Sequence, residues 1–403
     1  MAYTRKEYHT LRARIQEPRK FIHVLAGPRQ VGKSTLVGQI LQELTIPYSE
    51  EVADAVDPKD SDWIRRVWEG ARTTMRLRGE QERLLVIDEI QKINNWSEVV
   101  KREWDEDTRN HIELKVVLLG SSRLLLKKGL TESLAGRFEL IRLGHWSYQE
   151  MHEAFGTTLE QYIYFGGYPG AAHLVDDEKR WRKYIKDSLV TPSIEKDVLM
   201  TSTIYKPALM KQLFELGCSY SAEILSLTKL MGQLQDAGNV TTLASYLELL
   251  DQCTLLTGLQ KYAYDDARKR ASIPKYQVYN NALLTAYRGR SLQADRTDPT
   301  LWGRWVESAV GAHLIGSAEE MDYQVFYWRE SAKSRGDKDM EVDFVIVNNG
   351  EVTAIEVKSG RRSMNSGLPA FVKAFHPHKS FVVGTGGVSI EDFLSCDIEA
   401  LLN

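Results

Sequence analysis

The stretch GPRQVGKST, Gly27 to Thr35, follows the apolar run FIHVLA and precedes the helix-like segment LVGQILQEL. It fits the pattern GxxxxGK[ST] with two glycines, a lysine and a serine at the required places. Such glycines allow a loop whose backbone N–H groups surround phosphate oxygens, and the next helix points its positive end at them. A strand before and a helix after disfavour a chance glycine turn. The stretch predicts an ATP site formed by Gly27, Pro28, Arg29, Gln30, Val31, Gly32, Lys33, Ser34 and Thr35.

Mg²⁺ is the second cofactor that this motif implies, because the Ser34 hydroxyl is suited to ligate it while Lys33 contacts the β- and γ-phosphates. Two acids end the apolar run LLVIDE at residues 84–89. An acid at the end of a buried strand is costly unless it has a metal or a hydrogen-bonding partner. We therefore expect Asp88 to complete the Mg²⁺ shell and Glu89 to orient or deprotonate an attacking water. Hydrolysis is favoured over a kinase reaction, and a pair of solvated turn acids is the alternative.

Two further features of the first third have open interpretations. The run KVVLLGS (115–121) ends in GSSR, which places Ser121 or Ser122 as a sensor of the γ-phosphate or in a plain serine-rich turn. Arg137, in LAGRFELIRL, is either a cation for the γ-phosphate of its own or a neighbouring subunit, or an ordinary surface arginine.

The order of apolar segments predicts an α/β fold. Runs at 21–27, 84–89 and 115–121 alternate with helical patterns, which is typical of a parallel sheet built from βαβ units. The middle of the chain predicts helices over 221–238 and 240–252, joined at Gly238. The last hundred residues alternate in hydrophobicity, and Asn348-Asn349-Gly350 predicts a hairpin turn there.

Composition sets limits on the class of protein. The 403 residues carry a formal net charge of −3, which argues against a chain that coats nucleic acid by bulk charge. Three widely spaced cysteines disfavour structural zinc and a disulfide framework. The first twenty residues lack the apolar core of a secretory signal, and no apolar run approaches the ~18 residues of a membrane span. We expect a cytoplasmic protein without membrane contact.

The motifs GPRQVGKST, LLVIDEIQKINNW, KVVLLGSSRLLL and LAGRFELIRLGHWSYQE, in this order, resemble a prokaryotic branch of the AAA+ ATPases. The resemblance continues through YIYFGGYPGAAHLV and IEKDVL, which are similar to that family's lid and linker. It implies a strand between the P-loop strand and the strand ending at Asp88, and a ring-like homo-oligomer. The expected domains are an ATPase core (1–155), a helical lid and linker (156–200), a winged helix-turn-helix-like region (201–290) and a C-terminal domain (300–403).

Residues 221–265 resemble a winged helix-turn-helix. The exposed face of its second helix offers threonine, serine and glutamate, which suit base readout poorly. A basic wing follows, and we expect it to hold DNA phosphates without regard to sequence through Arg268, Lys269, Arg270 and Lys275. A module used only for packing or protein contact is the alternative.

The tail segment EVDFVIVNNGEVTAIEVKSG resembles the PD-(D/E)XK nuclease pattern, with Asp343, Glu356 and Lys358 in the motif positions. Two carboxylates on a metal and a lysine beside the attacking water suit phosphodiester cleavage. Glu307 is the candidate for a further acidic ligand, since Gly303 and Gly311 leave room beside it. Glu341-Val departs from the family, in which a proline is common. A degenerate fold kept for binding or assembly is the alternative. The following set of basic residues is either a further DNA contact or a solvated loop: Arg329, Lys333 and Arg335.

These observations favour an oligomeric AAA+ ATPase that couples ATP binding and hydrolysis to binding or remodelling DNA, including branched DNA. An ATP-regulated, metal-dependent nuclease of defence or repair is the second hypothesis. A signalling or scaffold ATPase that gates protein partners without DNA is the third.

Overall fold

The computed structural model describes residues 3–120, 130, 133–198, 204–235, 238–263, 265, 272–318, 320–332, 339–360 and 367–402. The chain forms two compact units. The first unit contains Met1–Gly144 and Glu195–Thr201, and the second contains His145–Ile194 and Ser202–Asn403. No helix in the described ranges is long and apolar enough to cross a membrane.

The first unit is built on a five-stranded parallel sheet in the order β2-β3-β4-β1-β5. This confirms the expected α/β class, and β4 lies between β1 and β3 as the family resemblance implied. The two edge strands escaped the sequence analysis because YSEEV and FELIR contain no continuous apolar run. The strands are β1 (Ile22–Ala26), β2 (Tyr48–Val52), β3 (Arg83–Asp88), β4 (Leu114–Gly120) and β5 (Phe138–Arg142).

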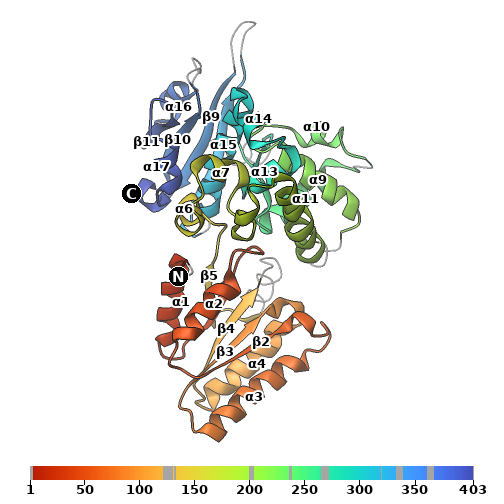
Figure 1. Cartoon of the computed structure of the whole chain (residues 1–403), viewed down its shortest axis with the longest axis vertical. Helices are drawn as coiled ribbons and strands as arrows, with labels where there is room; N and C mark the ends of the chain where they lie inside the picture. Colours follow the sequence, from red (N-terminus) through yellow and green to blue (C-terminus); the bar gives the residue numbers. More distant parts are fainter. Residues whose placement is uncertain are drawn as a thin grey trace. The chain divides into compact units, whose positions relative to one another are not determined.

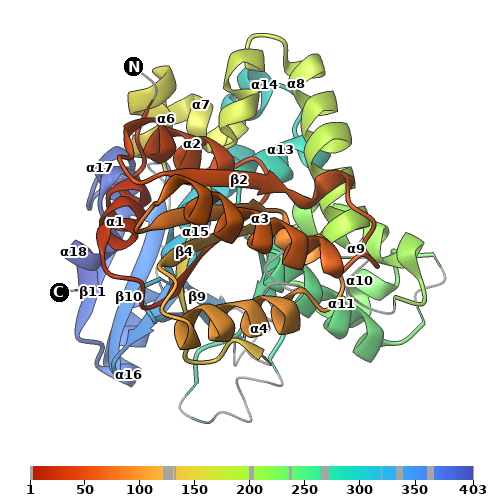
Figure 2. The same ribbon diagram turned by 90° about the horizontal axis from the view of Figure 1, so that it is seen from below.

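Helices cover both faces of this sheet. The helices α3 (Asp62–Arg78) and α4 (Trp96–Arg109) pack on one face against alternate residues of β1, β3 and β4, such as Val24, Leu85 and Val116. On the other face lie α1 (Lys6–Gln16) and α2 (Lys33–Glu43), and the Lys115 ammonium of β4 donates to the Ile15 carbonyl of α1 at 2.9 Å (Figures 1 and 2). The short 3₁₀ turns η1 (Ala53–Ala55) and η2 (Ile90–Lys92) follow β2 and β3.

The second unit begins with helices and contains the expected middle region. The second helix expected there is present as α11 (Val240–Gln252), which starts where the Asn239 side chain accepts from the Thr242 N–H. The first is wrong: only α10 (Leu227–Met231) is helical between 221 and 235, because Ala222 has a left-handed φ of 64° and Ile224 pairs with a neighbouring strand. The other elements are α6 (Tyr148–Phe155), α7 (Leu159–Phe165), η3 (Pro169–Leu174), α8 (Glu178–Tyr184), η4 (Ile185–Val190), α9 (Pro207–Ser219), β6 (Leu256–Leu259), β7 (Lys275–Val278), α13 (Asn281–Arg288) and α14 (Leu292–Arg296). The segment η5 (Ser193–Val198) begins in the second unit and ends in the first.

A four-stranded sheet in the order β11-β10-β9-β8 completes the second unit. The expected hairpin between β9 and β10 is confirmed, with Asn349 at φ 49° and Gly350 at φ 87°. On one face α16 buries Phe371 against Trp328 and Val342, and on the other face α15 approaches Phe344 (Figures 1 and 2). The elements are α15 (Pro299–Ala318), β8 (Gln324–Glu330), β9 (Met340–Asn348), β10 (Glu351–Lys358), α16 (Leu368–Phe375), β11 (Lys379–Gly384), α17 (Ile390–Ser395) and α18 (Ile398–Leu402).

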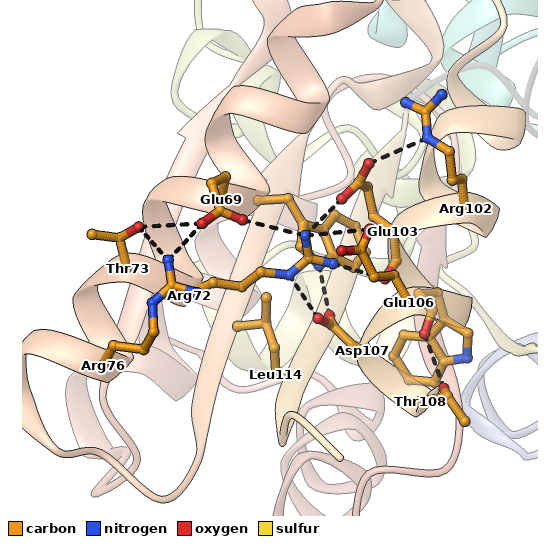
Figure 3. A network of polar contacts seen from close by, with 12 residues as sticks. Glu69, Arg72, Thr73, Arg76, Arg102, Glu103, Glu106, Asp107, Thr108 and Leu114 are labelled. Atoms are coloured by element: carbon orange, nitrogen blue, oxygen red, sulfur yellow. Dashed lines mark hydrogen bonds and ion pairs between the residues drawn. The ribbon is translucent and has the colours of Figure 1, made fainter. Parts of the chain in front are cut away.

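A buried ion-pair network joins α3 to α4 (Figure 3). The Arg72 guanidinium donates to Asp107 Oδ1 at 2.7 Å and to Glu103 Oε2 at 2.8 Å, and Trp68 Nε1 donates to Asp107 Oδ2 at 2.7 Å. Asp107 is fully buried, and burial raises the pKa of its carboxyl although Trp68 and Arg72 act in the opposite direction. Arg72 is therefore the buried cation that both acids share, while Glu103 has a further partner in Arg102 at 3.4 Å.

Replacing Arg72 by methionine is expected to destabilise the first unit by about 3–5 kcal/mol, because it leaves buried carboxylates without their cation. Arg76→Met is the matched control one turn along the same helix, where the exposed arginine pairs with Glu69 at 2.6 Å. It should cost less than about 1 kcal/mol. Urea midpoints of the two variants compare these costs, and equal shifts would contradict the role assigned to Arg72.

Candidate functional site

The P-loop connects β1 to α2 through backbone conformations that suit glycine. Gly32 caps α2 with φ 93°, and Gln30 also has a positive φ of 63°. The loop begins against the end of β5, so that a Cβ on Gly27 would lie 2.3 Å from the Leu143 carbonyl oxygen. A side chain at residue 27 would displace either the loop or this strand end, which explains the first glycine of the motif.

The Lys33 side chain lies inside the loop. It is buried, and its ammonium donates to the carbonyl oxygens of Gly27 at 2.9 Å and Pro28 at 2.7 Å. Because these carbonyls belong to the phosphate-binding motif itself, the positive charge is held where the motif places the β- and γ-phosphates.

Ser34 and Asp88 meet at the same edge of the sheet. Ala26 of β1 is level with Gly120 of β4, and Ile87 of β3 is level with Leu118. The Ser34 hydroxyl donates to Asp88 Oδ2 at 2.7 Å. A hydroxyl and a carboxylate side by side are the oxygen ligands that Mg²⁺ prefers, so these two residues fit the ion that the motif implies.

Glu89 has an unusual, left-handed backbone conformation. Its φ is 54°, which is uncommon for a residue with a side chain, and its N–H donates to Asp88 Oδ1 at 2.7 Å. The Gln91 amide donates to Glu89 Oε2 at 2.7 Å. Gln91 therefore helps orient the carboxylate expected to position water, and no sequence pattern singled it out.

Arg5 is a second residue that sequence reasoning missed. It is buried, although it precedes α1 in a polar segment, and its guanidinium donates to the carbonyls of Val31 at 3.4 Å and Gly144 at 3.1 Å. Arg5 thus supports the P-loop from outside the motif.

Arg137 lies at the amino ends of the parallel strands, whereas the P-loop lies at their carboxyl ends. The Ile22 N–H, at the start of β1, donates to its carbonyl, and the strand of roughly 13 Å separates it from the loop. Its guanidinium donates to both Asp105 carboxylate oxygens, at 2.7 and 3.0 Å. This placement contradicts a role at the nucleotide of its own subunit. Ser121 and Ser122 lie outside the described residues.

Three acids of the C-terminal region come together. Glu307 of α15 and the β9 residues Glu341 and Asp343 bring carboxylate oxygens within 4.8 Å of one another. The fully buried Lys275 ammonium lies among them, 2.5 Å from Glu307 Oε1 and 3.2 Å from Glu341 Oε1. We call these four residues the Lys275 cluster. Glu341, first noted only as a departure from the nuclease pattern, is thus part of the site.

The remaining nuclease candidates are arranged differently from the expectation. Glu356 does not belong to this group of three acids, and its carboxylate lies 3.5 Å from the Lys358 ammonium. Asp343 accepts from the Val357 N–H at 2.7 Å. Val357 itself is only partly buried, whereas Glu356 is buried.

Most of the expected DNA contacts receive no support from their positions. Lys275 was expected in an exposed basic wing, and this is wrong because its side chain is fully buried among acids. Arg329 pairs with Asp339 at 2.5 Å across the ends of its own loop. The remaining expected contacts lie outside the described residues: Arg268, Lys269, Arg270, Lys333 and Arg335.

A basic hollow of about 580 Å³ lies elsewhere in the second unit. One wall is formed by α8 and η4, and the other by Arg290 and Ser291, which directly precede α14. The Arg182 guanidinium donates to the Arg290 carbonyl at 3.2 Å. Lys179 and Lys183 are exposed on it, and Lys186 lies 4.6 Å from the Tyr287 ring. Five cations and two acids line the hollow: Lys179, Arg182, Lys183, Lys186, Arg290, Glu178 and Asp187.

Comparison with known families agrees with the geometry of the first unit. Residues 19–152 match a family described as an AAA domain. Residues 156–294 and 302–395 match two domains of unknown function, DUF8612 and DUF4143. The first unit is therefore an AAA-type P-loop domain, and the descriptions of the other two families specify no activity.

Individual relatives are distant. An uncharacterized protein of Methanocaldococcus jannaschii is 23% identical over 310 residues, which cover 72% of this chain and 64% of that protein. The match thus spans less than two thirds of that relative. Among solved structures, a Walker-type ATPase of Pyrococcus abyssi is 14% identical with a TM-score of 0.48, covering 71% of this chain and 98% of the other. The Aeropyrum pernix ORC1 protein in complex with DNA is 11% identical with a TM-score of 0.31, covering 72% and 92%. Similarity at this level carries no argument about function.

Glu89→Gln is expected to retain nucleotide binding and to lose hydrolysis by about 100-fold or more, because the amide cannot accept a proton from water. Glu51→Gln, an exposed position on β2, should leave both unchanged. Binding of a fluorescent ATP analogue and release of phosphate separate the two steps. Equal hydrolysis by Glu89→Gln and the wild-type protein would remove Glu89 from the mechanism.

Proposed function

We propose that this protein is an ATPase that couples ATP hydrolysis to binding or remodelling DNA. The observation that carries the ATPase part is the contact between Ser34 and Asp88 beside the P-loop, with Glu89 adjacent. Bound Mg²⁺ would neutralise charge on the β- and γ-phosphates. The P-loop N–H groups and Lys33 hold the phosphates, Ser34 and Asp88 supply oxygen ligands, and Glu89 orients water and takes its proton.

The basic hollow supports DNA as the target of this ATPase. Its five cations exceed its two acids by three charges, in a chain whose net charge is −3. Lys179 and Lys183 are exposed and form no ion pair among the described residues. A concave surface with unpaired lysines suits a phosphate backbone, and such binding is independent of sequence.

Assembly into an oligomer is part of the proposal. Since Arg137 lies far from the P-loop of its own domain, it can stabilise transition-state charge only at the nucleotide of another subunit. Leaving Asp105 would cost Arg137 a partly exposed ion pair, which is a small penalty.

ATP hydrolysis measured with linear, forked and four-way DNA tests the coupling. We expect at least one form to stimulate hydrolysis and to bind more weakly as salt rises. If the wild-type protein binds no DNA at low salt and hydrolyses ATP at a rate indifferent to DNA, the DNA proposal is wrong. An ATPase that gates protein partners would then account for the site.

Lys179→Ala combined with Lys183→Ala is expected to weaken DNA binding and to reduce the slope of log affinity against log salt by about two, one unit per lost phosphate contact. The control combines Lys59→Ala with Lys373→Ala, which removes the same charge from exposed lysines that do not line the hollow. An unchanged slope in the first variant would show that the hollow does not contact DNA. It would leave open binding of DNA elsewhere on the protein.

Mixing two inactive variants tests the role of Arg137. Arg137→Ala retains its P-loop and Lys33→Ala retains its arginine, so mixed oligomers should regain part of the hydrolysis that each lacks alone. Lys33→Ala mixed with Glu89→Gln should regain none, since both changes affect the same half of the site. Wild-type hydrolysis by Arg137→Ala alone would show that Arg137 takes no part.

A further inference from the structure

The Lys275 ammonium is enclosed by the acids of the cluster. Three oxygen atoms lie within 3.2 Å of its Nζ: Glu307 Oε1 at 2.5 Å, Glu341 Oε1 at 3.2 Å and the Asp343 carbonyl at 3.2 Å. The Asp343 carboxylate is 3.7 Å away. The ammonium donates hydrogen bonds to the Glu341 and Asp343 oxygen atoms and forms an ion pair with Glu307. The ring of Phe344, 5.1 Å from Nζ, covers a further side.

The backbone of Lys275 is fixed in this position. In β7 it pairs with Leu259 of β6, and on its other side it forms a bridge with Ile224. Two positions further along β7, the Gln277 amide donates to the Ser308 carbonyl of α15 at 2.8 Å. The lysine therefore enters the cluster from a strand that is itself bonded to the helix carrying Glu307.

The charges around Lys275 keep it protonated. Burial alone lowers the pKa of the ammonium, but Glu307, Asp343 and Glu341 outweigh this effect and the pKa is raised. Burial raises the pKa of the Glu307 and Asp343 carboxyl groups as well, so the pocket disfavours several uncompensated negative charges. The cluster thus already contains the cation that its acids require.

The space beside Glu307 is also filled by protein. A Cβ on Gly311 would lie 2.2 Å from Gln277 Oε1, and a Cβ on Gly303 would lie 3.0 Å from Ser359 Oγ. The glycines that the sequence suggested as room for a ligand instead allow β7 and the residue after β10 to approach α15 closely.

We propose that Lys275 is the resident cation of this cluster and replaces the divalent ion of a PD-(D/E)XK-type centre. Mg²⁺ needs oxygen ligands at about 2.0–2.1 Å, within the space that the ammonium occupies, and two cations so close repel each other strongly. The C-terminal sheet is then a nuclease-like arrangement without metal-dependent cleavage. In place of catalysis, the cluster fastens the segment of β6 and β7 to the C-terminal sheet.

Titration of the nucleotide-free protein with MnCl₂, followed by the electron paramagnetic resonance signal of free Mn²⁺, tests the replacement. We expect the wild-type protein, Glu307→Gln and Asp343→Asn to bind equal amounts of Mn²⁺. We also expect no nicking of supercoiled plasmid with Mg²⁺ or Mn²⁺, with or without ATP. A Mn²⁺ ion bound by the wild-type protein and lost in both variants, or nicking lost in Asp343→Asn, would overturn the proposal.

A double-mutant cycle tests the cation role of Lys275 directly. Lys275→Met should lower the melting temperature by roughly 10 °C, because it leaves buried carboxylates facing each other. Combining it with Glu307→Gln should cost clearly less than the sum of the two single changes, because each variant removes the partner of the other. Lys358→Met, at the partly exposed lysine of the nuclease pattern, is the control and should lower it less. Simple additivity of the first two losses would contradict charge compensation by Lys275.

Discussion

The nucleotide site depends on the parallel direction and common register of β1, β4 and β3. All three strands are almost wholly buried. They run parallel, and their register places their carboxyl ends within a residue of each other. The P-loop leaves this edge after Ala26, and Asp88 ends its strand there. The Ser34 hydroxyl can reach the Asp88 carboxylate because α2 starts directly at the end of the loop. A reversed β3 would instead place Asp88 at the far ends of these strands, away from the phosphate loop.

The features predicted from the sequence are those determined by neighbours along the chain. Continuous apolar runs identified the three central strands, and Asn349-Gly350 identified the hairpin because both residues adopt positive φ. Edge strands such as β2 were missed since their exposed charged residues carry no such signal. The sequence also extended a helix across Ile224, where a bridge to Lys275, far along the chain, determines the backbone instead.

The candidate sites show the same difference between features set by local sequence and features set by distant residues. The P-loop, Asp88 and Glu89 follow a local motif, and their relative positions agree with it. In the C-terminal region the motif residues Asp343, Glu356 and Lys358 are all present, yet the ammonium beside Asp343 comes from a residue 68 positions earlier. A lysine five residues after the basic run Arg268-Lys269-Arg270 gives no indication that it will be buried among acids. The chemistry of such a centre is therefore decided by a contact that no motif contains.

Arg5 connects two parts of the first unit that are far apart in the sequence. Its guanidinium contacts Val31 in the phosphate loop and Gly144, the last residue before the chain leaves the first unit. One guanidinium therefore ties the middle of the phosphate loop to the C-terminal boundary of this part of the first unit. Loss of the Arg5 side chain would remove support from both places at once.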